Sequence, residues 1–147
     1  SLVRNDTVAF TDGRVIADMV VPTGVNQWSG LALRMSGSAG TDSDWTGYVA
    51  RVDPVRDGAG TVSIAKTTNI YGGHTILATS ASSLWTYDTS FELEFKAIGT
   101  TLTVYLNGSS IVSTTDSTYT SGGFGVHSWF GNGTTRTNYD NMGIEAI

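Results

Sequence analysis

The chain has 147 residues and no cysteine, which suits one domain and excludes a disulfide framework, a thiolate metal site and a cysteine nucleophile. Its net charge is −5, and its eight Lys and Arg residues are scattered, which excludes the basic stripe of a nucleic-acid-binding protein. No apolar run approaches the roughly 18 residues that cross a bilayer, so we expect no membrane insertion.

Apolar residues alternate with period two along the chain, and Gly, Asn and Asp interrupt the alternation at short intervals, which is the pattern of antiparallel strands. No segment has the period of a helix. We expect an early strand around residues 2–10, followed by strands at 13–21, 29–36, 46–53, 60–66, 74–79, 90–98, 101–106, 109–114, 122–129 and 137–146. Gly99-Thr100 and Asn107-Gly108 predict two tight hairpins, because Asn-Gly tolerates the positive φ angles of a type I′ turn.

Short strands with turn signals every 8–12 residues predict an all-β fold, a two-sheet antiparallel β-sandwich or jelly roll. No linker or repeat interrupts residues 1–147, so we expect one domain, and the initial Ser favours a processed chain or a module of a larger protein. Alternation also predicts which side chains form the core. They are Leu31, Leu33, Met35, Phe91, Leu93, Phe95, Leu102, Val104, Leu106, Phe124 and Val126.

Seven stretches carry a family resemblance through their order along the chain. They are DGRVIADMVVP, SGLALRMS, GYVARVD, GTVSIAK, SFELEFKAIGTTLTVYLNG, DSTYTSGGFGVHSW and YDNMGIEAI. In this order they resemble the concanavalin A-like lectin/glucanase superfamily, in its laminin-G-like (LamG) branch, over nearly the whole chain. The resemblance implies two antiparallel sheets, one of them concave. Similar domains include carbohydrate-binding modules, lectins, family 16 glycoside hydrolases and virion domains that contact bacterial surfaces.

Glu92 and Glu94 are two residues apart on one expected strand, which places their carboxylates on one face at about 7 Å, a separation found in glycosidases. The hydrolases that this chain resembles carry a Glu-x-Asp-x-x-Glu or Glu-x-Asp-x-Glu run on an earlier strand. The equivalent strands here, TGYVARVDP and GTVSIAK, contain one carboxylate, Asp53. We therefore expect a protein that is not an enzyme, with Glu92, Glu94 and Lys96 forming a solvated strand face.

A second set of residues suits carbohydrate recognition, which needs flat aromatic surfaces for sugar C–H groups and planar polar groups for hydroxyls. Alternation places Trp28, Arg34, Arg51, His127 and Trp129 on the non-core side of their strands, with Arg34 and Arg51 facing the same way. The expected loops add Trp45 and Tyr71. An arginine pair beside Trp and His would suit an acidic or polyhydroxylated glycan. Exposed aromatic residues mark protein interfaces equally well.

The resemblance also implies a structural calcium ion, which many relatives hold on the convex side with an Asp at the start of the final strand and groups near the N-terminus. Asp140 matches the first position, and Asp12 could supply the second. Asp42 and Asp44 form a rival cluster of the oxygen ligands that Ca²⁺ prefers.

The expected function is a non-catalytic carbohydrate-binding or adhesion module of a secreted or virion surface protein, with a glycan or cell-surface polysaccharide as its partner. The first alternative is a decoration or tail-associated domain that contacts other structural protein subunits. The second is a glycoside hydrolase that uses Glu92 and Glu94. Fold alone does not decide among the three.

Overall fold

The computed structural model describes residues 2–25, 27–37, 45–53, 60–68, 73–128 and 135–147, with only the backbone described for residues 2–8. These residues form eleven strands. The strands are β1 (Leu2–Phe10), β2 (Gly13–Val20), β3 (Ser29–Ser36), β4 (Thr46–Asp53), β5 (Thr61–Thr67), β6 (His74–Thr79), β7 (Phe91–Ile98), β8 (Thr101–Leu106), β9 (Ser109–Thr115), β10 (Gly122–Ser128) and β11 (Asn138–Ala146). Each lies within one or two residues of an expected strand.

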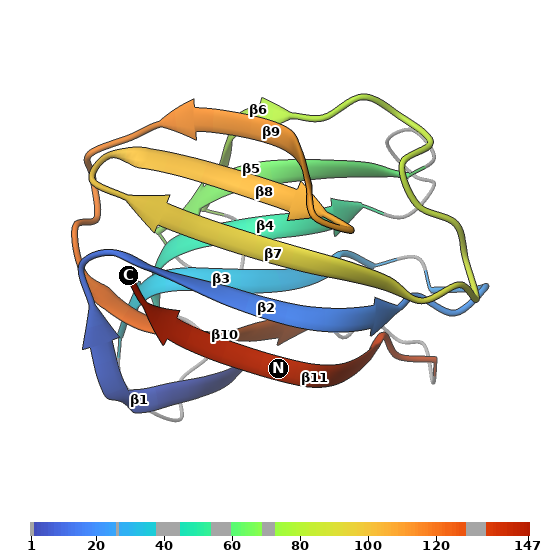
Figure 1. Ribbon diagram of the computed structural model, residues 1–147, viewed down its shortest axis with the longest axis horizontal. Helices are drawn as coiled ribbons and strands as arrows, with labels where there is room; N and C mark the ends of the chain where they lie inside the picture. Colours follow the sequence, from blue (N-terminus) through green and yellow to red (C-terminus); the bar gives the residue numbers. More distant parts are fainter. Residues whose placement is uncertain (1, 26, 38–44, 54–59, 69–72, 129–134) are drawn as a thin grey trace.

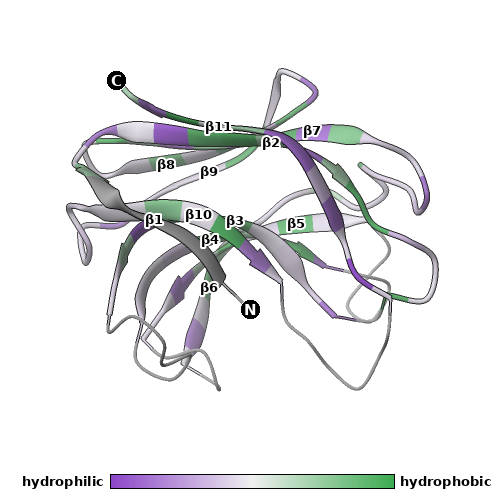
Figure 2. Ribbon diagram, turned by 90° about the horizontal axis from the view of Figure 1, so that it is seen from below, coloured by the Kyte–Doolittle hydropathy of each residue, from purple (hydrophilic) through white to green (hydrophobic). Residues whose placement is uncertain are grey.

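The strands form two antiparallel sheets that pack face to face (Figure 1). One sheet has six strands in the order β1-β10-β3-β4-β5-β6, and the other has five in the order β11-β2-β7-β8-β9. Figure 2 shows them as two layers. The predicted all-β sandwich is therefore confirmed. Within the described residues, no helix is long and apolar enough to cross a bilayer.

The main core fills the space between the two sheets. β2 and β7 alternate strictly between buried and half-buried residues over most of their length, because one face of each strand meets the other sheet. Leu31, Leu33, Phe95, Leu102 and Phe124 are fully buried in this core, as the alternation predicts.

The six-stranded sheet is also buried on its other face. Every residue of β3 except the last is buried, which a strand with one solvated face does not show. A second apolar cluster explains this pattern: Ala32, Met35, Trp45 and Val49 are buried together, and Trp28 packs against them. This outer face of the six-stranded sheet carries the candidate site.

A β-bulge at Arg34 reverses the alternation in β3. Leu33 pairs with Tyr48 but Ser36 pairs with Thr46, so β3 has one residue more than β4 over this stretch. Arg34 has a φ of 51°, in the left-handed region. Two predictions were wrong for this reason: Met35 belongs to the outer cluster rather than the main core, and Arg34 does not face the same way as Arg51.

Candidate functional site

Four rings from four separate parts of the chain meet on the outer face of the six-stranded sheet. His127 stacks on Trp28, with 4.4 Å between ring centroids and 16° between planes. His74 meets Trp28 edge-on at 4.9 Å, and Trp45 lies 5.3 Å from His127. β10 and β3 are hydrogen-bonded neighbours, and the register pairs His127 with Gly30, two residues after Trp28. We call Trp28, Trp45, His74 and His127 the ring cluster.

A polar row from β4, β5 and β6 adjoins the ring cluster. The Arg51 guanidinium lies 5.6 Å from the Trp28 ring centroid, within the range of a cation–π contact. Its Nε donates to Asp53 Oδ1 at 2.6 Å. Ser63 donates to Asp53 Oδ2 at 3.1 Å and also lies 3.1 Å from the Thr79 hydroxyl. Cation, carboxylate and hydroxyls therefore form one connected polar row beside Trp28.

Three buried polar atoms in the ring cluster lack a hydrogen-bond partner among the described residues: Trp45 Nε1 and both ring nitrogens of His127. Trp45 is 2% exposed and His127 is 0% exposed. Burial, and to a smaller extent nearby positive charge that includes His74, lowers the pKa of His127 to about 3. A neutral imidazole offers one donor and one acceptor, and an indole offers one donor. Buried groups of this kind are normally paired, so the three atoms are an exception within the described residues.

The strands beneath the ring cluster are fixed from the other sheet by Tyr139 of β11. Its hydroxyl donates to the His127 carbonyl at 2.7 Å and accepts from the Gly30 amide at 3.0 Å. Burial raises the pKa of Tyr139 to about 12, so it remains a donor at neutral pH. A Cβ at Gly30 would lie 1.8 Å from the Ala50 carbonyl oxygen, so only glycine fits there. The backbone on both sides of the Trp28–His127 stack is therefore held tightly.

Of the seven residues predicted for ligand binding, the structure brings four together: Trp28, Trp45, Arg51 and His127. Tyr71 and Trp129 lie outside the described residues. Arg34 is elsewhere, at one end of the sandwich.

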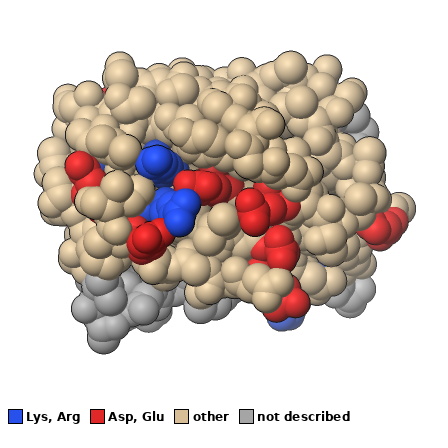
Figure 3. Space-filling view, viewed as in Figure 1, with Lys and Arg blue, Asp and Glu red and all other residues tan. Residues whose placement is uncertain are grey.

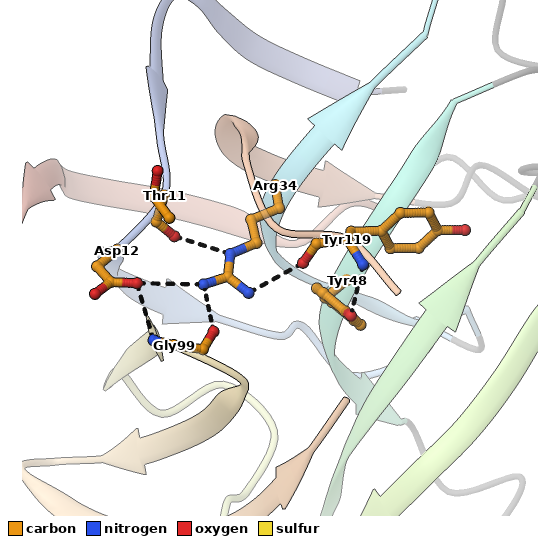
Figure 4. A network of polar contacts seen from close by, with 6 residues as sticks. All are labelled: Thr11, Asp12, Arg34, Tyr48, Gly99 and Tyr119. Carbon is orange, nitrogen blue, oxygen red and sulfur yellow. Dashed lines mark hydrogen bonds and ion pairs between the residues drawn. The ribbon is translucent and has the colours of Figure 1, made fainter. Parts of the chain in front are cut away.

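Arg34 is a buried cation that links the two sheets (Figure 4). Its guanidinium donates to three backbone carbonyls, those of Thr11 at 2.9 Å, Tyr119 at 3.0 Å and Gly99 at 2.7 Å. Its fourth partner is Asp12, at 3.4 Å. The side chain is 1% exposed, and all these partners are protein groups, so its role in this structure is to join turns of the sandwich.

The two residues predicted for calcium do not fit one site. Asp140 pairs with Asp18 on β2, whereas Asp12 precedes the start of β2, about 20 Å further along that strand. Asp12 is already engaged, because its Oδ1 accepts from the Gly99 amide at 2.9 Å and faces Arg34. The described residues contain no group of three or more His, Asp or Glu side chains that could hold a metal ion. Asp42 and Asp44 lie outside the described residues.

Glu92 and Glu94 lie on the five-stranded sheet, on the opposite side of the molecule from the ring cluster. Glu92 pairs with Asp18 and Glu94 with Ile16 across β2, and Arg14 Nη1 lies 3.4 Å from Glu94 Oε1. Figure 3 shows this side of the molecule, where Asp and Glu gather next to a few Lys and Arg. Both glutamates are half-buried in a mixed-charge strand face.

Sequence reasoning missed His74, Ser63 and Thr79 as members of the site, and it considered Asp53 only as an ion-pair partner for Arg34 or Arg51. These residues come from β4, β5 and β6, whose order in the sheet brings them beside β3. The one usable signal was in β4, where Arg51 and Asp53 are two residues apart and therefore share a face.

No family model matches the chain, and no curated protein sequence matches it. Among solved structures, the carbohydrate-binding module CBM66 from Bacillus subtilis is similar at 20% identity and a TM-score of 0.77, over 95% of this chain and 78% of that one. A tetrameric galectin from the ball sponge Cinachyrella is 11% identical with a TM-score of 0.65, over 98% and 99%. A protein described as a native glycosidic hydrolase is 12% identical with a TM-score of 0.65, over 95% and 66%.

These identities establish the fold alone. The chain is a jelly-roll sandwich of the concanavalin A-like type, with the architecture of CBM66 and the galectins. Membership in the LamG branch remains a prediction.

Proposed function

We propose that the chain is a non-catalytic carbohydrate-binding module that binds a glycan on the outer face of the six-stranded sheet. The observation that carries the proposal is the ring cluster, in which Trp45 Nε1 and the His127 ring nitrogens are buried and have no hydrogen-bond partner among the described residues. An aromatic plane beside unsatisfied hydrogen-bonding groups is what a sugar ring requires, because it presents C–H bonds on its faces and hydroxyls at its rim.

The part of Trp28 that is left exposed would supply an apolar aromatic contact for the sugar, and the adjoining polar row would bind hydroxyl groups. Arg51 donates, Asp53 accepts, and the hydroxyls of Ser63 and Thr79 can do either. The module CBM66 and the Cinachyrella galectin share this fold, which supports the proposal at the level of architecture.

Binding without hydrolysis is proposed because the chemistry of a glycosidase needs two carboxyl groups on opposite sides of the scissile bond. Asp53 is the described carboxylate beside the ring cluster, and it is held in an ion pair. Glu92 and Glu94 lie on the other sheet.

We place the module on a secreted or virion surface protein, as a composition low in charge and rich in Gly, Ser and Thr suggests. An assembly role with other structural subunits is the alternative. The flanking sequence of the parent gene product tests this placement, since neighbouring virion modules would favour attachment or assembly.

Trp28→Ala tests the site. The parent protein and the variant are titrated against a panel of soluble polysaccharides, and the variant is expected to bind at least about ten-fold more weakly, because a stacked aromatic ring is a typical binding hot spot. Tyr105→Ala is the matched control, since Tyr105 is a half-buried aromatic residue on the five-stranded sheet, and it should leave affinity unchanged.

Three results would contradict the proposal. The first is a parent protein that binds no member of the panel. The second is a folded Trp28→Ala variant with parental affinity. The third is release of reducing sugar by the parent protein, which would return attention to catalysis.

A further inference from the structure

We propose that Asp53 determines specificity: it neutralises Arg51 so that the site selects neutral glycans over anionic ones. This inference rests on the proposed function and goes beyond it by naming the class of glycan.

Arg51 is the group that would otherwise attract an anion. Its guanidinium lies 5.6 Å from the Trp28 ring centroid, and its side chain is 16% exposed. Near a protein surface, an unpaired cation attracts a carboxylate at contact distance more strongly than it would in bulk water. With Arg51 alone, the polar row would favour uronic acids or sulfated sugars.

Asp53 cancels this attraction. Its carboxylate lies 2.6 Å from Arg51 Nε and is 4% exposed, so the two charges form a close, largely desolvated pair. The hydrogen bond from Ser63 holds the second carboxylate oxygen in place. An incoming anionic sugar therefore meets a cation and a carboxylate of equal and opposite charge. The Asp53 carboxylate cannot turn away, because both of its oxygens are held.

Two other described cations of the six-stranded sheet do not add positive charge to this face. Arg34 and Lys66 face inward, where they are bound to Asp12 and Asp116. The imidazole of His127 is buried and neutral at neutral pH. The expectation of an arginine pair suited to acidic glycans is thus replaced by one arginine that already has its counter-ion.

The experiment compares each neutral polysaccharide with its own carboxylated form, made by oxidising the primary hydroxyl groups. β-Glucan, galactan, mannan and fructan serve as probes at about pH 8, above the ordinary histidine pKa of about 6.5. The parent protein is expected to bind the neutral form at least ten-fold more tightly. Asp53→Asn should reduce that preference at least ten-fold, because it removes the carboxylate that pairs with the Arg51 Nε.

Glu94→Gln is the matched control, since it removes one carboxylate from an arginine pair on the other sheet and changes the net charge equally. It should leave the preference unchanged. Arg51→Gln provides a second test if Asp53→Asn does not fold, and it should increase the preference for neutral glycans at least ten-fold because it removes the cation paired with Asp53.

Equal or tighter parental binding of the carboxylated forms would overturn the role of Asp53 while leaving the proposed function intact. So would a folded Asp53→Asn or Arg51→Gln variant with the parental preference, or a shift in Glu94→Gln as large as that in Asp53→Asn. If the parent protein binds neither form, the proposed function itself fails, and the role of Asp53 fails with it.

Discussion

His127 couples the ring cluster to pH because its imidazole is buried without a hydrogen-bond partner among the described residues. Burial lowers its pKa from 6.5 to about 3 in the folded state. Between these two values the unfolded chain binds a proton that the folded chain does not, so the free energy of unfolding increases with pH across this window. The contribution of His127 is complete above about pH 6.5 and is lost as the pH falls toward 3.

We expect His127→Phe to flatten this dependence while preserving the stack on Trp28. Urea unfolding of the parent protein between about pH 4.5 and 6.5, where carboxylates are largely ionised, should show a slope of up to about 1.4 kcal/mol per pH unit. The slope of the variant should be smaller over the same range. Equal slopes in the two proteins would mean that His127 is accessible to protons in the folded state.

Among the elements, the β7–β8–β9 meander shows the closest agreement between sequence pattern and structure. Asn107 and Gly108 have φ angles of 49° and 82°, as a type I′ turn requires. The Asn107 side chain adds a second link, because its Oδ1 accepts from the Glu92 amide at 2.9 Å. Two adjacent residues thus set the register of three strands.

Gly108→Ala is expected to lower the free energy of unfolding by about 1–2 kcal/mol, the cost of a left-handed backbone for a residue with a Cβ. No atom lies within 4 Å of the position that the Cβ would take, so the loss should reflect backbone conformation rather than a clash. Thr101→Ala, at an exposed position on β8, should change stability by less than about 0.5 kcal/mol. Equal effects of the two substitutions in urea unfolding would contradict this account.

The same local rules fail in β3. Period-two alternation predicts where the strand lies and that Leu31 and Leu33 point into the core, because these two properties depend only on neighbouring residues in the sequence. It cannot reveal the bulge at Arg34, because the sequence of β3 is compatible with alternation that continues past Arg34 and with alternation that shifts there by one residue. Only the pairing of β3 with β4 and β10 distinguishes these two registers. The site was recovered in part for a similar reason: alternation identifies residues on a non-core face, but the sheet order that brings His74 to Trp28 is a long-range property.

The edge strands share a feature that alternation also misses. β1, β6, β9 and β11 each carry extra residues relative to the strand beside them, as the register shifts at Phe10, Ala65, Tyr105 and Gly143 show. Bulges of this kind distort an edge and discourage pairing with another chain. β6 and β9 contain no Asp, Glu, Lys or Arg, so the bulges are the main protection of those two edges.

At the scale of the whole molecule, polar side chains join the two sheets at several places around the apolar core. Tyr139 reaches from β11 to β3 and β10. Tyr48 and Lys66 meet Asp116, which follows β9. Burial would raise the pKa of Asp116, but hydrogen bonds from Thr118, Tyr48 and Lys66 outweigh it and lower that pKa. This contact therefore stabilises the fold above the ordinary Asp pKa and is lost in strong acid.

Arg34 is the most deeply buried charge among these links, and its removal is the sharpest test of how the sheets are joined. Arg34→Met keeps the length of the side chain but leaves three carbonyls and Asp12 without their donor, so we expect a loss of roughly 3 kcal/mol in the free energy of unfolding. Arg14→Met is the control, because Arg14 is 38% exposed on the outer face of the five-stranded sheet and its ion pairs with Glu94 and Glu145 should contribute less than about 1 kcal/mol.

Urea unfolding of both variants measures the difference between the two arginines. Because Arg34 lies at the end of the sandwich and not beside Trp28, a folded Arg34→Met variant should also keep the glycan affinity of the parent protein. A loss of affinity comparable to that of Trp28→Ala would contradict this position and restore Arg34 to the binding face. Unchanged stability would instead mean that the turns at Asp12 and Gly99 are held by the apolar core alone.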